Sequence, residues 1–120
     1  MCEARDELIA FLNRELPGRR VTGEEADRIS RECIHRHGYG DYIIHRTGHG
    51  IDTLPHGYGV NLDSIEFPDS RPFMEGSCFS VEPGIYLDSF GMRTEINAYI
   101  RENRALISGG KIQREIIPLA

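Results

Sequence analysis

The sequence has few cysteines and no long apolar run, and each shortage excludes a class of protein. Its three cysteines are odd in number and widely spaced, so they predict neither a disulfide framework nor a zinc knuckle. We therefore expect a reducing, cytoplasmic environment. No apolar run approaches the length of a membrane span, and the first residues lead into an amphipathic pattern instead of a signal peptide. Accordingly, no membrane partner is expected.

Basic residues are also in the minority. Lysine and arginine number 14 against 19 aspartates and glutamates, which gives a formal net charge of −5. A nucleic-acid surface needs clustered basic residues, so no nucleic-acid partner is expected. The content of 39% apolar and 28% charged residues is ordinary for a folded protein, and 120 residues suffice for one small core. The prediction is a single domain over residues 1–120.

Two amphipathic helices are predicted in the first part of the chain. Apolar residues recur every four positions from Ala4 to Leu16, so a helix is expected from Glu3 to about Leu16. A second helix is expected to open at Thr22, where Glu25 completes a capping box. Its buried face is predicted to contain Ala26, Ile29, Cys33 and Ile34, and Gly38 suits the left-handed position after its end. We interpret His35 and His37, in the last turn, as surface residues and not as metal ligands.

Strands are predicted in most of the remaining chain. The expected strands are Asp41–Ile44, Cys78–Leu87, Met92–Ile100, Arg104–Ile107 and Ile112–Ile117. The second and third of these are expected to pair antiparallel. The segment from Gly57 to Pro72 is predicted to be a loop in which Asp63, Glu66 and Asp69 are exposed. Helices followed by strands indicate an α+β fold.

Three of the five histidines fall between His45 and His56. Histidine is the commonest metal ligand and titrates near neutral pH. Gly48 and Gly50 flank His49, so another backbone or a ligand can approach that residue closely. A glycine-rich turn whose histidines are merely polar remains open as the simpler interpretation.

Two carboxylates stand at unusual positions. Glu82 interrupts an apolar strand just before Pro83, and Glu95 lies inside the neighbouring strand, two residues from Arg93. A carboxylate inside a sheet is costly unless it is paired or binds a metal. An ion pair with Arg93, or an exposed strand face, would explain Glu95 without a metal, and an edge-strand position would explain Glu82. Together with His49, however, these carboxylates make a reasonable partial shell for Mn, Co or Zn.

Three motifs in order resemble one known family. The segments His45–Ile51, Gly76–Tyr86 and Gly91–Glu95 are similar to those of the pita-bread metallopeptidases, which include methionine aminopeptidases, Xaa-Pro aminopeptidases, prolidases and creatinases. The resemblance is strongest to the Xaa-Pro aminopeptidase or dipeptidase type. It implies the C-terminal half of a pita-bread domain, with two N-terminal helices packed on a curved, mainly antiparallel sheet.

The resemblance also implies roles for single residues. His49, Glu82 and Glu95 would be ligands of two divalent metal ions, and Glu82 would assist proton transfer. His56 would hydrogen-bond the peptide substrate and stabilise its tetrahedral intermediate. His45 would line the substrate site, and Arg93 would support Glu95 or the bound peptide. Two such ions can share a hydroxide and polarise a scissile carbonyl.

The chain departs from the family pattern in several places. The family has two further aspartate ligands on a preceding strand pair, whereas the candidates here lack that context: Asp6, Asp27 and Asp41. Asp52 stands where a glycine is usual, Gly57 stands where an acidic residue is frequent, and Ile96-Asn97 replaces acidic residues after Glu95.

These departures leave three interpretations open. The chain is an enzyme fragment or one half of a split enzyme, whose complementary half-domain supplies the aspartates. Alternatively, it is a non-catalytic binding module. In the third interpretation it is a homodimer of half-domains, because a bare sheet edge invites pairing.

Overall fold

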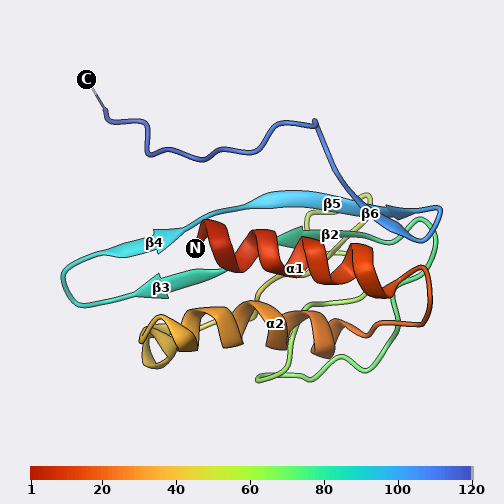
Figure 1. Cartoon of the computed structure of the whole chain (residues 1–120), viewed down its shortest axis with the longest axis horizontal. Coiled ribbons are helices and arrows are strands. Elements are labelled where there is room, and N and C mark those ends of the chain that lie inside the picture. The colour runs from red at the N-terminus through yellow and green to blue at the C-terminus, as the bar shows by residue number, and fades with distance from the viewer. Residues whose placement is uncertain (120) are drawn as a thin grey trace.

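The computed structural model describes residues 1–119 and consists of two helices packed against antiparallel strands (Figure 1). This confirms the predicted α+β class and both helices. No helix in the described part of the chain is long and apolar enough to cross a bilayer. In chain order the elements are α1 (Cys2–Glu15), α2 (Gly23–Arg36), the 3-10 turn η1 (Gly40–Tyr42), β1 (Gly50–Ile51), β2 (Cys78–Val81), β3 (Gly84–Tyr86), β4 (Gly91–Arg93), β5 (Ile96–Arg101) and β6 (Arg104–Ile107).

The start of α2 follows the predicted capping box. The Thr22 hydroxyl accepts the Glu25 N–H at 3.2 Å, and the Glu25 carboxylate accepts the Thr22 N–H at 2.8 Å. Two backbone donors at the helix start are thereby satisfied. Beyond the helix end, Gly38 has a φ of 80°, the left-handed conformation expected of it.

The strands form two sheets with one common register. The first sheet has the order β1-β2-β5-β6, and the second pairs β3 with β4. Val81 faces Ile96 at the end of the β2–β5 ladder, and Gly84 faces Arg93 where the β3–β4 ladder begins. Two residues on each side separate these pairs, so the ladder resumes without a slip. The predicted strand pair is therefore antiparallel, as expected, but interrupted.

Pro83 explains the interruption. The Thr94 N–H donates to the Pro83 carbonyl at 3.3 Å. In a regular hydrogen-bonded pair the N–H of residue 83 would also donate to the carbonyl of residue 94, but proline has no N–H to donate. The shared register thus places Glu82 opposite Glu95 in the gap between the two ladders.

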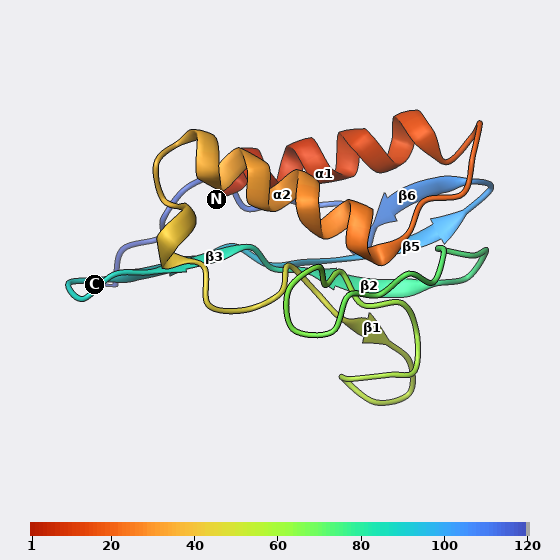
Figure 2. The ribbon, with the colours of Figure 1, turned by 90° about the horizontal axis from the view of Figure 1, so that it is seen from below.

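The two faces of this ribbon carry different residues. Phe79 and Val81 on β2, with Ile96 and Ala98 on β5, are buried in the main core. The core also includes Leu8, Leu12, Phe11 and Leu16 of the first helical segment. Because side chains alternate along a strand, Glu82 and Glu95 belong to the other face. Figure 2 shows the helices on one side of the sheet and β1, with the loop after it, on the other.

Four predictions about the backbone are wrong. The single strand expected over Cys78–Leu87 is divided at Glu82 and Pro83 into β2 and β3. The strand expected at Asp41–Ile44 is instead η1, because the backbone closes local bonds from Tyr42 to Tyr39 and from Ile43 to Gly40. The single strand expected over Met92–Ile100 is divided into β4 and β5 by the gap opposite Pro83. The strand expected at Ile112–Ile117 does not form, because the chain leaves the sheet after β6 at two glycines with positive φ, Gly109 and Gly110.

The loop predicted from Gly57 to Pro72 is confirmed, but two of its carboxylates are buried. Asp63 is fully buried and accepts backbone N–H groups from residues 65, 66 and 67, and Asp69 accepts the Asn61 N–H and pairs with Arg71. A loop without strand partners must satisfy its backbone donors by other means, and carboxylates do so here. The expected exposure of Asp63 and Asp69 is therefore wrong, whereas Glu66 is exposed as predicted.

Candidate metal centre

His49 reaches the site because its segment runs beside β2. Gly50 pairs with Phe79. The Ser80 N–H donates to the His49 carbonyl at 2.9 Å, and the Glu82 N–H donates to the Thr47 carbonyl at 2.7 Å. The pairing thus continues beyond β1 and sets His49 next to Ser80. The His49 ring consequently lies on the same face as Glu82, away from the helices.

His49 and Glu82 face each other directly. The His49 Nε2 atom lies 3.7 Å from Glu82 Oε1, which is longer than a hydrogen bond. At the other side of the ring, Nδ1 lies 3.1 Å from the Gly50 carbonyl oxygen. A carbonyl oxygen only accepts, so Nδ1 carries the proton and Nε2 is the atom presented to Glu82. In metal sites, a histidine that binds the ion through one ring nitrogen usually donates the N–H of its other ring nitrogen to such an acceptor.

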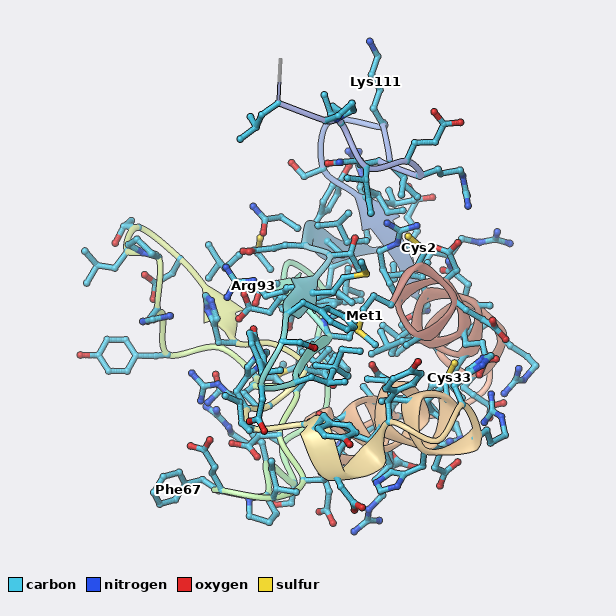
Figure 3. All side chains as sticks on the ribbon, turned by 90° about the vertical axis from the view of Figure 1, so that its left-hand side faces the viewer. Met1, Cys2, Cys33, Phe67, Arg93 and Lys111 are labelled. Atoms are coloured by element: carbon cyan, nitrogen blue, oxygen red, sulfur yellow. The ribbon has the colours of Figure 1, made fainter. Side chains whose placement is uncertain are left out.

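The register brings Glu95 to the same place from the opposite strand. Residues directly opposite in an antiparallel pair have Cβ atoms about 4.5–5.5 Å apart, and like charges there repel. The Glu95 side chain is 45% exposed, and its Oε2 lies 3.7 Å from an Arg93 guanidinium nitrogen. That distance is longer than a hydrogen bond, so Arg93 and Glu95 form a loose, solvent-exposed ion pair, and the Glu95 side chain is free to turn. Figure 3 shows Arg93 on the side of the molecule away from the helices.

His56 packs against His49 from the loop after β1. The two ring centroids lie 4.1 Å apart at an interplanar angle of 84°, an edge-to-face contact. His56 is exposed, whereas His49 is buried. The structure therefore groups His49, His56 and Glu82, with His56 at the solvent side.

Asp52 organises the loop that carries His56, a role that sequence reasoning missed. Its carboxylate accepts the Leu54 N–H at 2.8 Å and the Tyr58 N–H at 3.1 Å. These backbone bonds lower the pKa of Asp52 below its ordinary value. A Cβ atom at Gly57 would come within 2.5 Å of this carboxylate. The two departures from the family pattern are thus one structural unit, since Asp52 fills the space that a side chain at residue 57 would need.

His45 is engaged within the chain through both ring nitrogens. Its Nδ1–H donates to the Arg46 carbonyl at 2.7 Å, and its Nε2 lies 2.8 Å from the Tyr86 hydroxyl. With the proton on Nδ1, Nε2 accepts and the Tyr86 O–H donates. Tyr86 was not recognised from the sequence. The available signal was alternation, because Tyr86 follows Glu82 by four residues along the ribbon and so shares its face.

Asp27 is a second residue that sequence reasoning missed. It is fully buried on α2 and accepts the Thr47 N–H at 2.9 Å and the Ser64 N–H at 2.8 Å. The Thr47 carbonyl in turn accepts the Glu82 N–H, so Asp27 connects the helix layer to the sheet face that carries His49 and Glu82. A carboxylate on the apolar face of an amphipathic helix was the available signal.

The donor set suits a divalent cation. One imidazole nitrogen and two carboxylates match Mn, Co or Zn. However, the Glu95 carboxylate does not lie close to both His49 and Glu82. Within residues 1–119, only Glu3, Cys33 and His37 form a group of three donors that all lie within 4.8 Å of one another. Glu95 is therefore farther than this from His49 or Glu82, and its exposed side chain would have to turn toward them.

Comparison with known proteins agrees with these motifs. Residues 1–102 match the metallopeptidase family M24. An Xaa-Pro dipeptidase of Lactobacillus helveticus is 46% identical over 76 residues, which are 62% of this chain and 20% of that protein.

Solved structures show the same arrangement. A dipeptidase from Pyrococcus horikoshii OT3 superposes with a TM-score of 0.80 at 28% identity over 98% of this chain and 30% of that chain. An Xaa-Pro dipeptidase from Bacillus anthracis gives 0.79 at 30% identity over 98% and 31%. The chain thus spans between a fifth and a third of these relatives. With its two helices and antiparallel strands arranged as in part of a pita-bread domain, the chain belongs to metallopeptidase family M24.

Proposed function

We propose that this chain supplies part of the metal shell and substrate face of an Xaa-Pro-type aminopeptidase or dipeptidase. The observation that carries the proposal is the approach of His49 Nε2 to Glu82, with Glu95 opposite Glu82 on the same sheet face. All three side chains lie on the face away from the helices, where a shared cation would give them a common partner. A cation between them would relieve the repulsion of the two opposed carboxylates.

His49, Glu82 and Glu95 would hold Mn²⁺, Co²⁺ or Zn²⁺, two ions in the complete site. Such an ion lowers the pKa of a bound water and polarises a carbonyl group. Glu82, whose side chain is 15% exposed, would accept a proton from the attacking water and return it to the leaving amine. Arg93, which is half exposed, would hold Glu95 or the carboxylate of the peptide.

The histidines would contact the peptide. His56 is exposed at the solvent side of His49 and would donate a hydrogen bond to the substrate carbonyl, which stabilises the developing oxyanion. His45 would act through Tyr86. The Tyr86 O–H donates a hydrogen bond to His45 Nε2, so the lone pairs of the Tyr86 oxygen stay free to accept a hydrogen bond from a peptide N–H.

A complementary half-domain would complete the shell. Asp6 and Asp27 lie on helices and Asp41 lies in η1, so none of these three can act as a strand-borne ligand. The half-exposed Glu95 leaves the shell open on one side. We infer that further carboxylates come from a partner segment, and that without it two copies of the chain associate.

Calorimetric titration of the metal-stripped chain tests the proposal. We expect Mn²⁺ affinity on the order of micromolar, about −8 kcal/mol. Glu82→Gln and Glu95→Ala should each weaken it at least about tenfold, or about 1.4 kcal/mol. Glu66→Gln, at an exposed position of the loop, is the matched control and should leave binding unchanged. Binding that is absent, or indifferent to both site variants, would instead indicate a non-catalytic binding module.

Light scattering tests the association. We expect the particle mass to rise with concentration, and we expect it to become that of one chain plus one half-domain when a complementary half-domain is added. A clean monomer at high concentration would contradict self-association. Hydrolysis of an Xaa-Pro dipeptide by the mixture, and not by either part, would support the split-enzyme arrangement.

A further inference from the structure

A second group of metal-ligating side chains lies on the helix side of the molecule. It consists of Glu3 in the first turn of α1, Cys33 in the last turns of α2 and His37 directly after α2. One donor atom from each residue lies within 4.8 Å of the other two. The site opposite the helices contributes none of these residues, so the two groups are separate.

The packing of the helices creates this group. The start of α1 lies beside the end of α2, and Ala4, Cys33, Ile34 and Ile85 form a small apolar cluster there. Cys33 is 1% exposed and lies between the two helices in Figure 3. The sequence spacing of Glu3 and Cys33 gives no hint of this contact, which is why His37 was interpreted only as a surface residue.

The group borders a cavity. About 340 Å³ of space is lined by all three side chains and by apolar residues that include Tyr39, Ile85 and Phe90. His37 Nε2 lies 3.1 Å from Glu3 Oε2, and both side chains are more than half exposed. Cys33 thus forms the buried floor, whereas Glu3 and His37 form a movable rim.

We propose that Glu3, Cys33 and His37 bind a thiophilic transition-metal ion of the zinc class. Thiolate, imidazole and carboxylate are the three ligand types that proteins use for Zn²⁺. Three protein ligands would leave one tetrahedral position of a zinc ion, which a small molecule or water in the adjoining cavity could fill. The sulfur separates this site from the sheet site, whose ligands are nitrogen and oxygen only and suit harder ions.

The local charge favours a cation. Glu7 joins Glu3 near the Cys33 thiol. Arg36 is the neighbouring cation, and it is already paired with Glu7 at 2.6 Å. The C-terminal end of α2 adds the negative end of a helix dipole. Negative charge therefore predominates around the three side chains, which favours a bound cation.

Cobalt spectroscopy tests this site without peptidase activity. Metal-stripped chain, kept reduced by a reagent without thiols, is titrated with Co²⁺, and Zn²⁺ is then added. We expect a thiolate-to-cobalt charge-transfer band in the near ultraviolet that Zn²⁺ abolishes. The band should vanish in Cys33→Ser. It should persist in Cys78→Ser and Cys2→Ser, which remove the other two thiols, and in Glu82→Gln, which damages the sheet site.

Surface variants keep the test decisive if Cys33→Ser unfolds. His37→Ala and Glu3→Gln change exposed side chains, and each should weaken Zn²⁺ affinity at least tenfold while circular dichroism stays unchanged. The absence of a band in the folded chain would overturn the proposal. So would a band that survives Cys33→Ser or that disappears in Cys78→Ser.

Discussion

The two faces of the ribbon formed by β2 and β5 are built by different interactions. The face under the helices is apolar and continuous, with Phe79, Val81 and Ala98 fully buried. The opposite face is polar and is held by single hydrogen bonds, such as that from the His49 N–H to the Ser80 hydroxyl at 3.0 Å. The first face stabilises the fold by removing apolar area from water. On the second face, individual hydrogen bonds fix where the side chains lie.

This difference separates stability from function. Loss of packing under the helices should unfold the chain as a whole. Loss of a hydrogen bond on the opposite face, or of the close backbone approach between the His49 segment and β2, should displace a few candidate ligands and leave the helices in place. The following substitutions test that separation, beginning with the largest expected effect.

Phe79→Ala should have the largest effect. The Phe79 ring is fully buried and lies 4.7 Å from the Phe73 ring. Truncating such a side chain leaves a cavity, and the free energy of unfolding should fall by about 3–5 kcal/mol. This free energy is measured by urea denaturation, with circular dichroism as the signal. Tyr58→Ala, at a side chain that is 93% exposed, is the control. A loss below about 1 kcal/mol for Phe79→Ala would show that the helix-covered face is not the source of stability.

Gly48→Ala should act on the opposite face. A Cβ atom at Gly48 would lie 2.0 Å from the Ser80 carbonyl oxygen, so the His49 segment must move away from β2. We expect a loss of about 1–3 kcal/mol from overpacking and at least tenfold weaker Mn²⁺ binding.

Gly18→Ala is the matched control for this glycine. Its nearest neighbour, the Glu15 carbonyl oxygen, would be 3.8 Å from the added Cβ atom. Both stability and Mn²⁺ affinity should stay close to those of the unchanged chain. Equal effects of the two substitutions would contradict a special role for the close approach at Gly48.

The smallest effect should be seen in the pH dependence of the His56 loop. The pKa of Asp52 is lowered by the Leu54 and Tyr58 N–H bonds, so its folded value lies below the ordinary 3.8. The carboxylate therefore holds the loop at all pH values above 3.8 and releases it as the pH falls through the lower folded value. Amide proton shifts of Leu54 and Tyr58 should move only in that acidic range. A midpoint at or above 3.8 would contradict the bonding seen here.

The helix-covered face could be predicted from the sequence because its signals are periodic. Apolar spacing located α1, and the Thr22 capping box located the start of α2. Each of these signals acts between neighbours in the chain. The strand predicted at Ile112–Ile117 does not form because isoleucines at its two ends indicate only a local preference for extended backbone, and not that a partner strand exists.

The opposite face could be predicted only in part. The motifs located His49, Glu82 and Glu95, but they said nothing of how the loops are fixed. Asp27 and the Glu3–Cys33–His37 group depend on contacts between distant segments, which no periodic pattern in a single sequence reveals. Asp52 acts within its own loop, on the Leu54 and Tyr58 N–H groups, and an irregular loop has no repeating pattern either. Buried Asp63 is a local case like Asp52, because it accepts N–H groups of residues 65 and 66 in a loop whose shape no periodic pattern predicts.

Line broadening by Mn²⁺ in amide NMR spectra tests most directly whether the face away from the helices holds a cation. Substoichiometric Mn²⁺ should first broaden the amide signals of His49, Glu82 and Glu95, while those of Cys33 and His37 stay sharp. Broadening centred on Cys33 and His37, or spread evenly over exposed carboxylates, would contradict a metal centre on the sheet face.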